Sequence, residues 1–157
     1  MKTLIIYTSK YGCTADCATL LREKLSSDVT IIDAKNYTKK IEFEAFDTII
    51  FGTSIYTGHI SKEIHTLCNE NLELLCQKNI GLFLCCGLAD QADAFFNTNF
   101  PAELLEHAQM KQHFGSEARL NKMKFLDKSI LRAVTKGDYS AFEILHENIE
   151  AFAEAFN

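Results

Sequence analysis

The chain has 157 residues, of which 47% are hydrophobic and 24% charged, with a formal net charge of -5. This composition is typical of one folded domain over residues 1–157, and a single proline with seven glycines argues against disorder or a collagen-like chain. The negative charge gives no reason to expect a nucleic acid as a partner.

Apolar runs alternate with helical patterns along the first half of the chain. Residues 2–8 are β-branched and apolar enough for a buried strand. Residues 14–25 follow with apolar residues at helical spacing and a threonine at the cap position. Further strands are predicted over 29–34 and 47–54, joined by a polar crossover at 35–46.

The second half continues the same alternation. A helix is predicted over 61–79, with a bend near 69–71. The continuous apolar run at 80–86 predicts a central strand covered on both faces. A helix, a strand and two closing helices are then expected at 92–108, 111–119, 121–135 and 139–156.

Strands that alternate with helices at this spacing predict a parallel sheet in one three-layer α/β domain with five strands. Ligands of such sheets bind at the carboxyl ends of the strands, near the switch point in strand order. This rule selects three loops, at 8–14, 53–59 and 87–93. They are the candidate functional part of the chain.

The first of these loops, "TSKYGCT", combines hydroxyl groups with a glycine just before a helix. The helix would direct unpaired N–H groups and a positive dipole end into the loop, which suits a phosphate. The spacing matches neither the P-loop nor the G-x-G-x-x-G pattern. A plain turn with a threonine cap is the alternative interpretation.

The second and third loops offer surface for a flat ligand. In "GTSIYTGHI", Ile55 and Tyr56 provide apolar surface and Gly58 permits an unusual backbone angle. The alternative is a hairpin-like loop whose Tyr56 caps the core. The third loop has Gly87 and backbone polar groups but no aromatic residue, and its acids are at 90 and 93.

The cysteines stand at 13, 17, 68, 76, 85 and 86, and no pair has C-x-x-C spacing. Cys13 and Cys17 could share a helix face, yet unlinked thiols in a reducing compartment and no metal are the better expectation. No apolar run is long enough for a signal-peptide core or a membrane span, so a cytoplasmic location is expected.

A charged pattern marks the run "NKMKFLDKSILRAVTK". Its basic residues form one helical stripe, which Phe125 joins: Lys124, Lys128, Arg132 and Lys136. The opposite stripe is expected to face the core: Met123, Leu126, Ile130 and Val134. The basic stripe is a candidate docking surface for an acidic redox partner or an anionic membrane, against the alternative of a solvated helix face.

The loops "TSKYGCT" and "GTSIYTGHISK" resemble the phosphate and flavin-ring loops of the flavodoxin-like family. With the later "FGSEARLNKMKFLDKSILR", they are most similar to its menaquinone-dependent protoporphyrinogen dehydrogenase branch. The resemblance implies a five-stranded sheet of order 2-1-3-4-5 and FMN as the cofactor. It implies a cofactor site of Thr8, Ser9, Lys10, Tyr11, Gly12, Cys13 and Thr14 at the phosphate, Thr53, Ser54, Ile55, Tyr56, Thr57 and Gly58 along the isoalloxazine, and Gly87, Leu88 and Ala89 at its other edge.

Three functions follow from this resemblance. The first is a redox protein that carries electrons between cytoplasmic partners on FMN, with no catalytic residue assigned. The second is a protoporphyrinogen dehydrogenase that passes electrons to a quinone at the membrane. The third is a flavin-free interaction module that keeps the fold. The charge of Lys10, with no carboxylate in the first two loops, predicts surroundings less negative than those of an acidic flavodoxin.

Overall fold

A computed structural model describes residues 1–157 and has a five-stranded parallel sheet in the order β2-β1-β3-β4-β5. The strand order and the three-layer α/β class are those expected from the sequence. The strands are β1 (Lys2–Tyr7), β2 (Asp28–Asp33), β3 (Thr48–Ser54), β4 (Asn79–Cys85) and β5 (Met110–His113).

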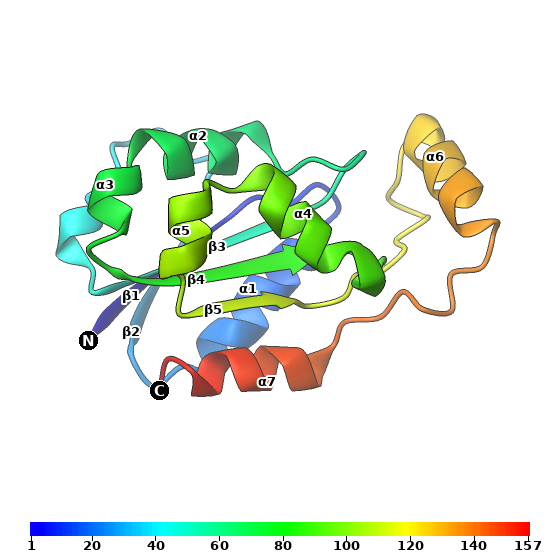
Figure 1. Ribbon diagram of the computed structural model, residues 1–157. Coiled ribbons are helices and arrows are strands. Elements are labelled where there is room, and N and C mark those ends of the chain that lie inside the picture. The colour runs from blue at the N-terminus through cyan, green and yellow to red at the C-terminus, as the bar shows by residue number, and fades with distance from the viewer.

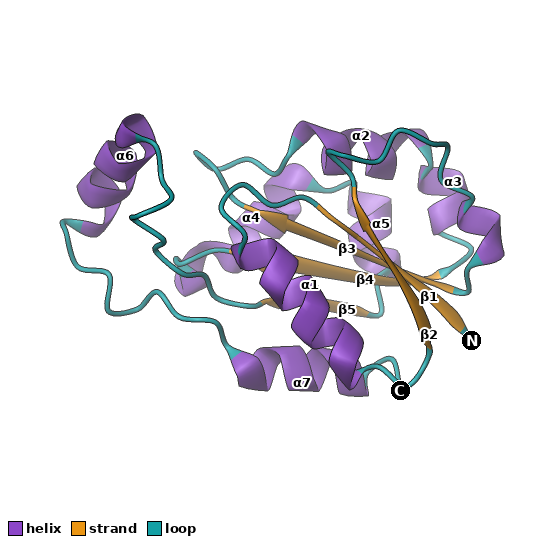
Figure 2. Cartoon of the chain, turned by 180° about the vertical axis from the view of Figure 1, so that it is seen from behind, coloured by secondary structure: helices purple, strands orange, loops and turns teal.

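Helices cover both faces of this sheet, and one helix lies outside the layers (Figure 1). On one face lie α1 (Cys13–Lys24), which crosses in front of the strands in Figure 2, and α7 (His146–Glu154), which lies below them in that view. The other face carries α2 (Lys62–Glu70), α3 (Leu72–Leu75), α4 (Ala92–Asn99) and α5 (Ala102–His107). The remaining helix, α6 (Phe125–Thr135), lies beyond the carboxyl ends of the strands, opposite to both termini. None of the helices combines the length and the apolar character needed to cross a membrane.

The alternation of side chains along the strands divides the core into two halves. In β1, Leu4 and Ile6 belong to the core under α2–α5, whereas Ile5 belongs to the core under α1 and α7. All three are fully buried. Successive side chains of a strand point to opposite faces, so a continuous apolar run is what a doubly covered sheet requires.

Two of the predicted helices are divided. The bend predicted near 69–71 is confirmed, because Asn71 separates α2 from α3. The single helix predicted over 92–108 is wrong: α4 ends at Asn99, and Phe100 is extended before Pro101. A proline disfavours the helical conformation of the residue that precedes it, and the next helix starts after it.

The chain makes a long excursion over residues 115–144 between β5 and α7. The strand predicted over 111–119 ends at His113, and Gly115 then forms an antiparallel bridge with Ile144. The helix predicted over 139–156 begins only at His146. Upstream, the Asp138 carboxylate accepts a hydrogen bond from the Ser140 N–H at 3.0 Å, a turn that competes with helix formation. The excursion carries α6 to the edge of the sheet where the three candidate loops meet.

Candidate functional site

A cavity of about 250 Å³ lies at the carboxyl ends of β1, β3 and β4, where the sequence placed the ligand site. Twelve of the sixteen predicted cofactor residues line it: Ser9, Lys10, Tyr11, Cys13, Thr14, Ser54, Ile55, Tyr56, Thr57, Gly58, Gly87 and Leu88. Four do not reach its wall: Thr8, Gly12, Thr53 and Ala89. The remaining wall comes from residues that were not expected there: Cys85, Cys86, Phe95, Ser116, Glu117, Met123, Asp127, Ile130, Leu131, Val134 and Phe142.

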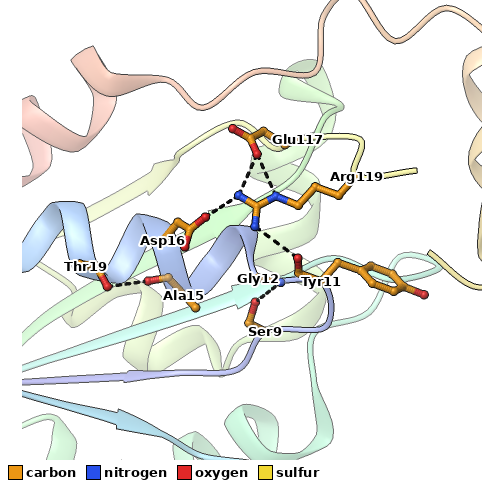
Figure 3. A network of polar contacts seen from close by, with 8 residues as sticks. All are labelled: Ser9, Tyr11, Gly12, Ala15, Asp16, Thr19, Glu117 and Arg119. Carbon is orange, nitrogen blue, oxygen red and sulfur yellow. Dashed lines mark hydrogen bonds and ion pairs between the residues drawn. The ribbon is translucent and has the colours of Figure 1, made fainter. Parts of the chain in front are cut away.

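The first loop turns into α1 at a glycine. Gly12 has a φ of 94° and is the residue that precedes the helix, so the threonine cap predicted at Thr14 is wrong. The Gly12 N–H donates to the Ser9 hydroxyl at 3.0 Å, and no side chain caps α1 (Figure 3). The N–H groups of an uncapped first turn, together with the helix dipole, attract an anion. Thr14 is buried on the wall beside this turn.

Arg119, from the excursion, holds the outside of this loop. Its guanidinium contacts the Asp16 carboxylate at 2.5 Å and the Glu117 carboxylate at 2.7 Å (Figure 3). It also donates to the Tyr11 carbonyl at 3.3 Å, while the Tyr11 ring points away from it. These contacts, led by the hydrogen bond with Asp16, raise the pKa of Arg119 above its ordinary value. No motif or spacing in the sequence singles out Arg119.

Hydroxyl groups behind the cavity join the first and second loops. The Thr8 hydroxyl donates to Ser61 at 2.8 Å and lies 3.1 Å from the Thr53 hydroxyl. Thr53 in turn accepts from the Ser61 N–H at 3.3 Å. Thr8 and Thr53 are therefore occupied in joining strand ends, which is why these two predicted ligands lie behind the wall.

The second loop is a tight hairpin. Tyr56 and His59 exchange two backbone hydrogen bonds, of 2.9 and 3.0 Å. Thr57 and Gly58 between them have positive φ angles of 49° and 81°, which confirms the unusual backbone angle expected at Gly58. Tyr56 is 40% exposed and lines the cavity. The hairpin of the alternative interpretation is therefore present, but Tyr56 does not cap the core as that interpretation expected.

A carboxylate from α6 joins the first two loops across the cavity. Asp127 accepts a hydrogen bond from the Tyr56 hydroxyl at 2.6 Å and another from the Tyr11 hydroxyl. The Lys10 ammonium lies 2.8 Å from Oδ2 of Asp127, the oxygen that also accepts from Tyr11, and 3.7 Å from the centre of the Tyr56 ring. Asp127 is only 5% exposed. Four groups from three segments thus form one polar cluster, which we call the Asp127 cluster: Lys10, Tyr11, Tyr56 and Asp127.

The charges of the Asp127 cluster depend on one another. Hydrogen bonds from Lys10, Tyr11 and Tyr56 hold the pKa of Asp127 well below its usual range. Partial burial lowers the pKa of Lys10, but its hydrogen bond and attraction to Asp127 outweigh this and raise the pKa overall. The loop sequences, which led us to expect less negative surroundings, do not include this acid, because α6 supplies it. The sequence signal was an acid on the apolar side of an amphipathic helix, four residues after Met123.

The third loop receives its aromatic neighbour from the excursion. The Phe142 ring packs so closely on Gly87 that a Cβ there would lie 2.2 Å from it. Phe142 and Leu88 line the cavity, whereas Ala89 starts a short 3-10 turn that leads away. The loop lacks an aromatic residue of its own in sequence, yet an aromatic ring stands beside it in space.

The stripes predicted on α6 are only partly as expected. Met123, Ile130 and Val134 face the cavity instead of the core, and Leu126 is 66% exposed. Phe125 is 85% exposed. The basic side chains are all exposed, with Lys128 and Arg132 within α6 and the other two at its ends, Lys124 and Lys136. Because α6 lies outside the layers, its apolar side covers the ligand cavity instead of the core, and part of that apolar side stays exposed to solvent.

The fold and the cavity define a doubly wound α/β protein with a ligand site at the switch point of its sheet, between β1 and β3. The flavodoxin domain model matches residues 4–143, and the chain belongs to this family. No protein of curated function shows a significant sequence match to the chain.

Solved structures share the fold at low sequence identity. A short-chain flavodoxin associated with a bacterial microcompartment is 14% identical, with a TM-score of 0.62 over 99% of this chain and 96% of its own. A flavodoxin from the domain Archaea is 15% identical, with a TM-score of 0.57 over 99% of both chains. A flavoprotein from Lactobacillus acidophilus, solved in complex with FMN, is 14% identical, with a TM-score of 0.51 over 71% of this chain and 92% of its own.

Proposed function

We propose that this protein binds FMN and carries electrons between partner proteins. The observation that supports this most directly is the position of the cavity between the uncapped start of α1 and the hairpin at Tyr56. A phosphate fits the first and a planar ring system fits the second. The Lactobacillus acidophilus flavoprotein of the same fold was solved with FMN. Bound FMN supplies the redox chemistry, and the protein supplies binding, orientation and electrostatics.

The residues of the cavity fit the two ends of FMN. At the phosphate end, Ser9 and Thr14 provide hydroxyl groups and the first turn of α1 provides N–H groups. At the ring end the wall is apolar, with Ile55, Tyr56 and Phe142 among its side chains. The Lys10 charge, expected to serve the phosphate, is shared with Asp127. Phosphate binding therefore rests mainly on neutral donors.

Titration of the purified protein with FMN and with riboflavin tests this proposal. We expect FMN to bind more tightly, because riboflavin lacks the phosphate. Thr14→Ala should weaken FMN by about tenfold or more and riboflavin little, since a hydrogen bond to a charged group contributes about 1.5–3 kcal/mol. Thr19→Ala, an exposed threonine further along α1, is the matched control. Equal loss for both flavins would place the phosphate elsewhere, and the absence of flavin binding would favour the flavin-free interaction module.

A second candidate is the membrane-surface enzyme of the protoporphyrinogen dehydrogenase branch. It is favoured by α6, which exposes Phe125 and Leu126 beside the basic stripe. Exposed apolar side chains next to basic ones suit an anionic lipid surface. The carrier instead uses the basic stripe to meet an acidic reductase or acceptor.

Vesicle binding separates the two candidates. The variant with glutamine at 124, 128, 132 and 136 should keep its stability, because exposed charges contribute little to folding. If the membrane enzyme is correct, this variant loses binding to anionic vesicles, Phe125→Ser adds to the loss, and the wild type supports protoporphyrinogen oxidation by membranes. If the protein is an electron carrier, the wild type does not bind the vesicles. The glutamine variant is then reduced more slowly than the wild type by a reductase, at low salt only.

A further inference from the structure

Three cysteine thiols, two from α1 and one from β4, meet beneath the first loop. Cys13 is the first residue of α1, Cys17 lies one helical turn later, and Cys85 is the last residue of β4. Their Sγ atoms all lie within 4.8 Å of one another. The three side chains are 8%, 0% and 2% exposed, in that order. We call them the cysteine triad.

The fold brings the three thiols together. Residues i and i+4 of a helix share one face, and this face of α1 packs on the sheet. The carboxyl end of β4 reaches the same place, because β4 lies two strands from β1 in the sheet. The side chains around the triad are apolar, among them Ile5 and Phe83. Cys68 and Cys76 lie elsewhere, and Cys68 belongs to the core on the opposite face of the sheet.

The distances within the triad suit a thiophilic metal ion. The centre of a triangle with 4.8 Å sides lies about 2.8 Å from each corner, within about 0.5 Å of the Zn–S distance of about 2.3 Å. Small side-chain rotations would therefore complete the contacts. All the protein ligands are sulfur, which selects soft ions such as Zn²⁺ and Cd²⁺ over Mg²⁺ or Ca²⁺.

The start of α1 favours a thiolate at Cys13, which such an ion requires. Cys13 lies at the positive end of the α1 dipole and accepts a backbone hydrogen bond from Glu117. Three thiolates with a divalent ion carry one net negative charge, which the positive end of the α1 dipole partly offsets.

We propose that Cys13, Cys17 and Cys85 form a binding site for one divalent thiophilic metal ion, with a fourth position that opens to the ligand cavity. Cys13 and Cys85 both line that cavity, so the ion has a path to the triad. Binding releases the thiol protons to solvent and changes no oxidation state. The site depends on the three sulfur atoms alone and does not rest on the proposed FMN function, although Cys13 and Cys85 also line the flavin cavity.

Titration of the reduced, flavin-free protein with Cd²⁺ tests the site, with a phosphine reductant in the buffer. We expect sulfur-to-cadmium ultraviolet absorbance that saturates at one ion per chain. Zn²⁺ should displace the bound Cd²⁺ and so remove this absorbance. It should also raise the melting temperature of the protein, because it binds the folded state. Cys17→Ser and Cys85→Ser should each weaken Cd²⁺ by at least tenfold. Cys68→Ser, equally buried in the other core, is the matched control and should leave binding unchanged.

A measurement on the wild type covers the case in which the triad variants fail to fold. Zn²⁺ should protect Cys13 from alkylation in a mass-spectrometric assay, while the partly exposed Cys76 continues to react. Protection of both thiols, or of neither, overturns the proposal. So does a cadmium signal that survives both triad substitutions in folded protein, or a wild type without the signal. In these cases the three thiols serve only as small apolar side chains of the core.

Discussion

The Tyr56 hydroxyl donates a 2.6 Å hydrogen bond to Asp127, a residue 71 positions later in the chain. This contact joins the second loop to α6, the one helix outside the layers. Lys10 and Tyr11 bring the first loop to the same carboxylate. The cover of the cavity is thus held by a single buried acid, and the behaviour of this acid is open to experiment.

Asp127→Asn should favour FMN over riboflavin. The substitution removes a negative charge beside the first loop, the proposed phosphate site, and frees Lys10 from its ion pair. At about 1 kcal/mol for one charge pair in a polar environment, the ratio of the two affinities should rise by about fivefold. Parallel flavin titrations measure this ratio, which is insensitive to a loosened α6. Asp28→Asn, an equal charge change on the exposed start of β2, should leave the ratio unchanged. A lower ratio in Asp127→Asn would contradict the prediction.

The Asp127 carboxylate should also make stability depend on pH in the acid range. Its pKa in the folded protein is lowered, chiefly by the hydrogen bond from Lys10, relative to about 3.9 in an unfolded chain. The unfolded state therefore binds the proton more readily, and the stabilisation is complete above about pH 5 and declines as the pH falls below it. Urea unfolding of wild type and Asp127→Asn between pH 7 and pH 3 should show their stability difference shrinking. Parallel curves would show that this carboxyl has the same proton affinity in both states.

Gly12→Ala should destabilise the protein through both conformation and contact. An alanine at a φ of 94° costs about 1–2 kcal/mol, and its Cβ would lie 2.7 Å from the Arg119 guanidinium. Gly137→Ala is the matched control, because its φ is 78° and nothing lies within 4 Å of the new Cβ. Urea unfolding should show a larger loss for Gly12→Ala. Repeating both substitutions in an Arg119→Ala background should remove the difference between them, and a difference that persists would exclude the contact with Arg119 as its cause.

Two variants of Tyr56 separate its ring from its hydroxyl. Tyr56→Ala should weaken FMN and brighten the fluorescence of the bound flavin, because it removes an aromatic quencher from the wall of the cavity. Tyr56→Phe should keep the quenching and lose only the hydrogen bond to Asp127. Titrations followed by flavin fluorescence compare the two. If the alanine variant binds FMN as the wild type does, with the same fluorescence, Tyr56 does not contact the flavin.

Local sequence determined most of the fold. The apolar runs predicted each strand to within one or two residues, except for β5, and the helical patterns predicted α1 and the bend between α2 and α3. Patterns over a few residues suffice here, because a strand or helix depends mainly on which of its faces is buried. The ligand site also followed from local order, since the carboxyl ends of parallel strands meet at one edge of the sheet. Twelve of the predicted residues accordingly line the cavity.

Tertiary structure alone decided what the excursion over 115–144 does. Arg119 contacts the first loop, Asp127 joins the first and second loops, and Phe142 packs on Gly87. In the same way, Cys85 reaches the two cysteines of α1. Each of these contacts joins side chains that are tens of residues apart. Neither residue spacing nor hydrophobic periodicity predicts such a contact, because the contact depends on where a complete helix or loop packs against the sheet.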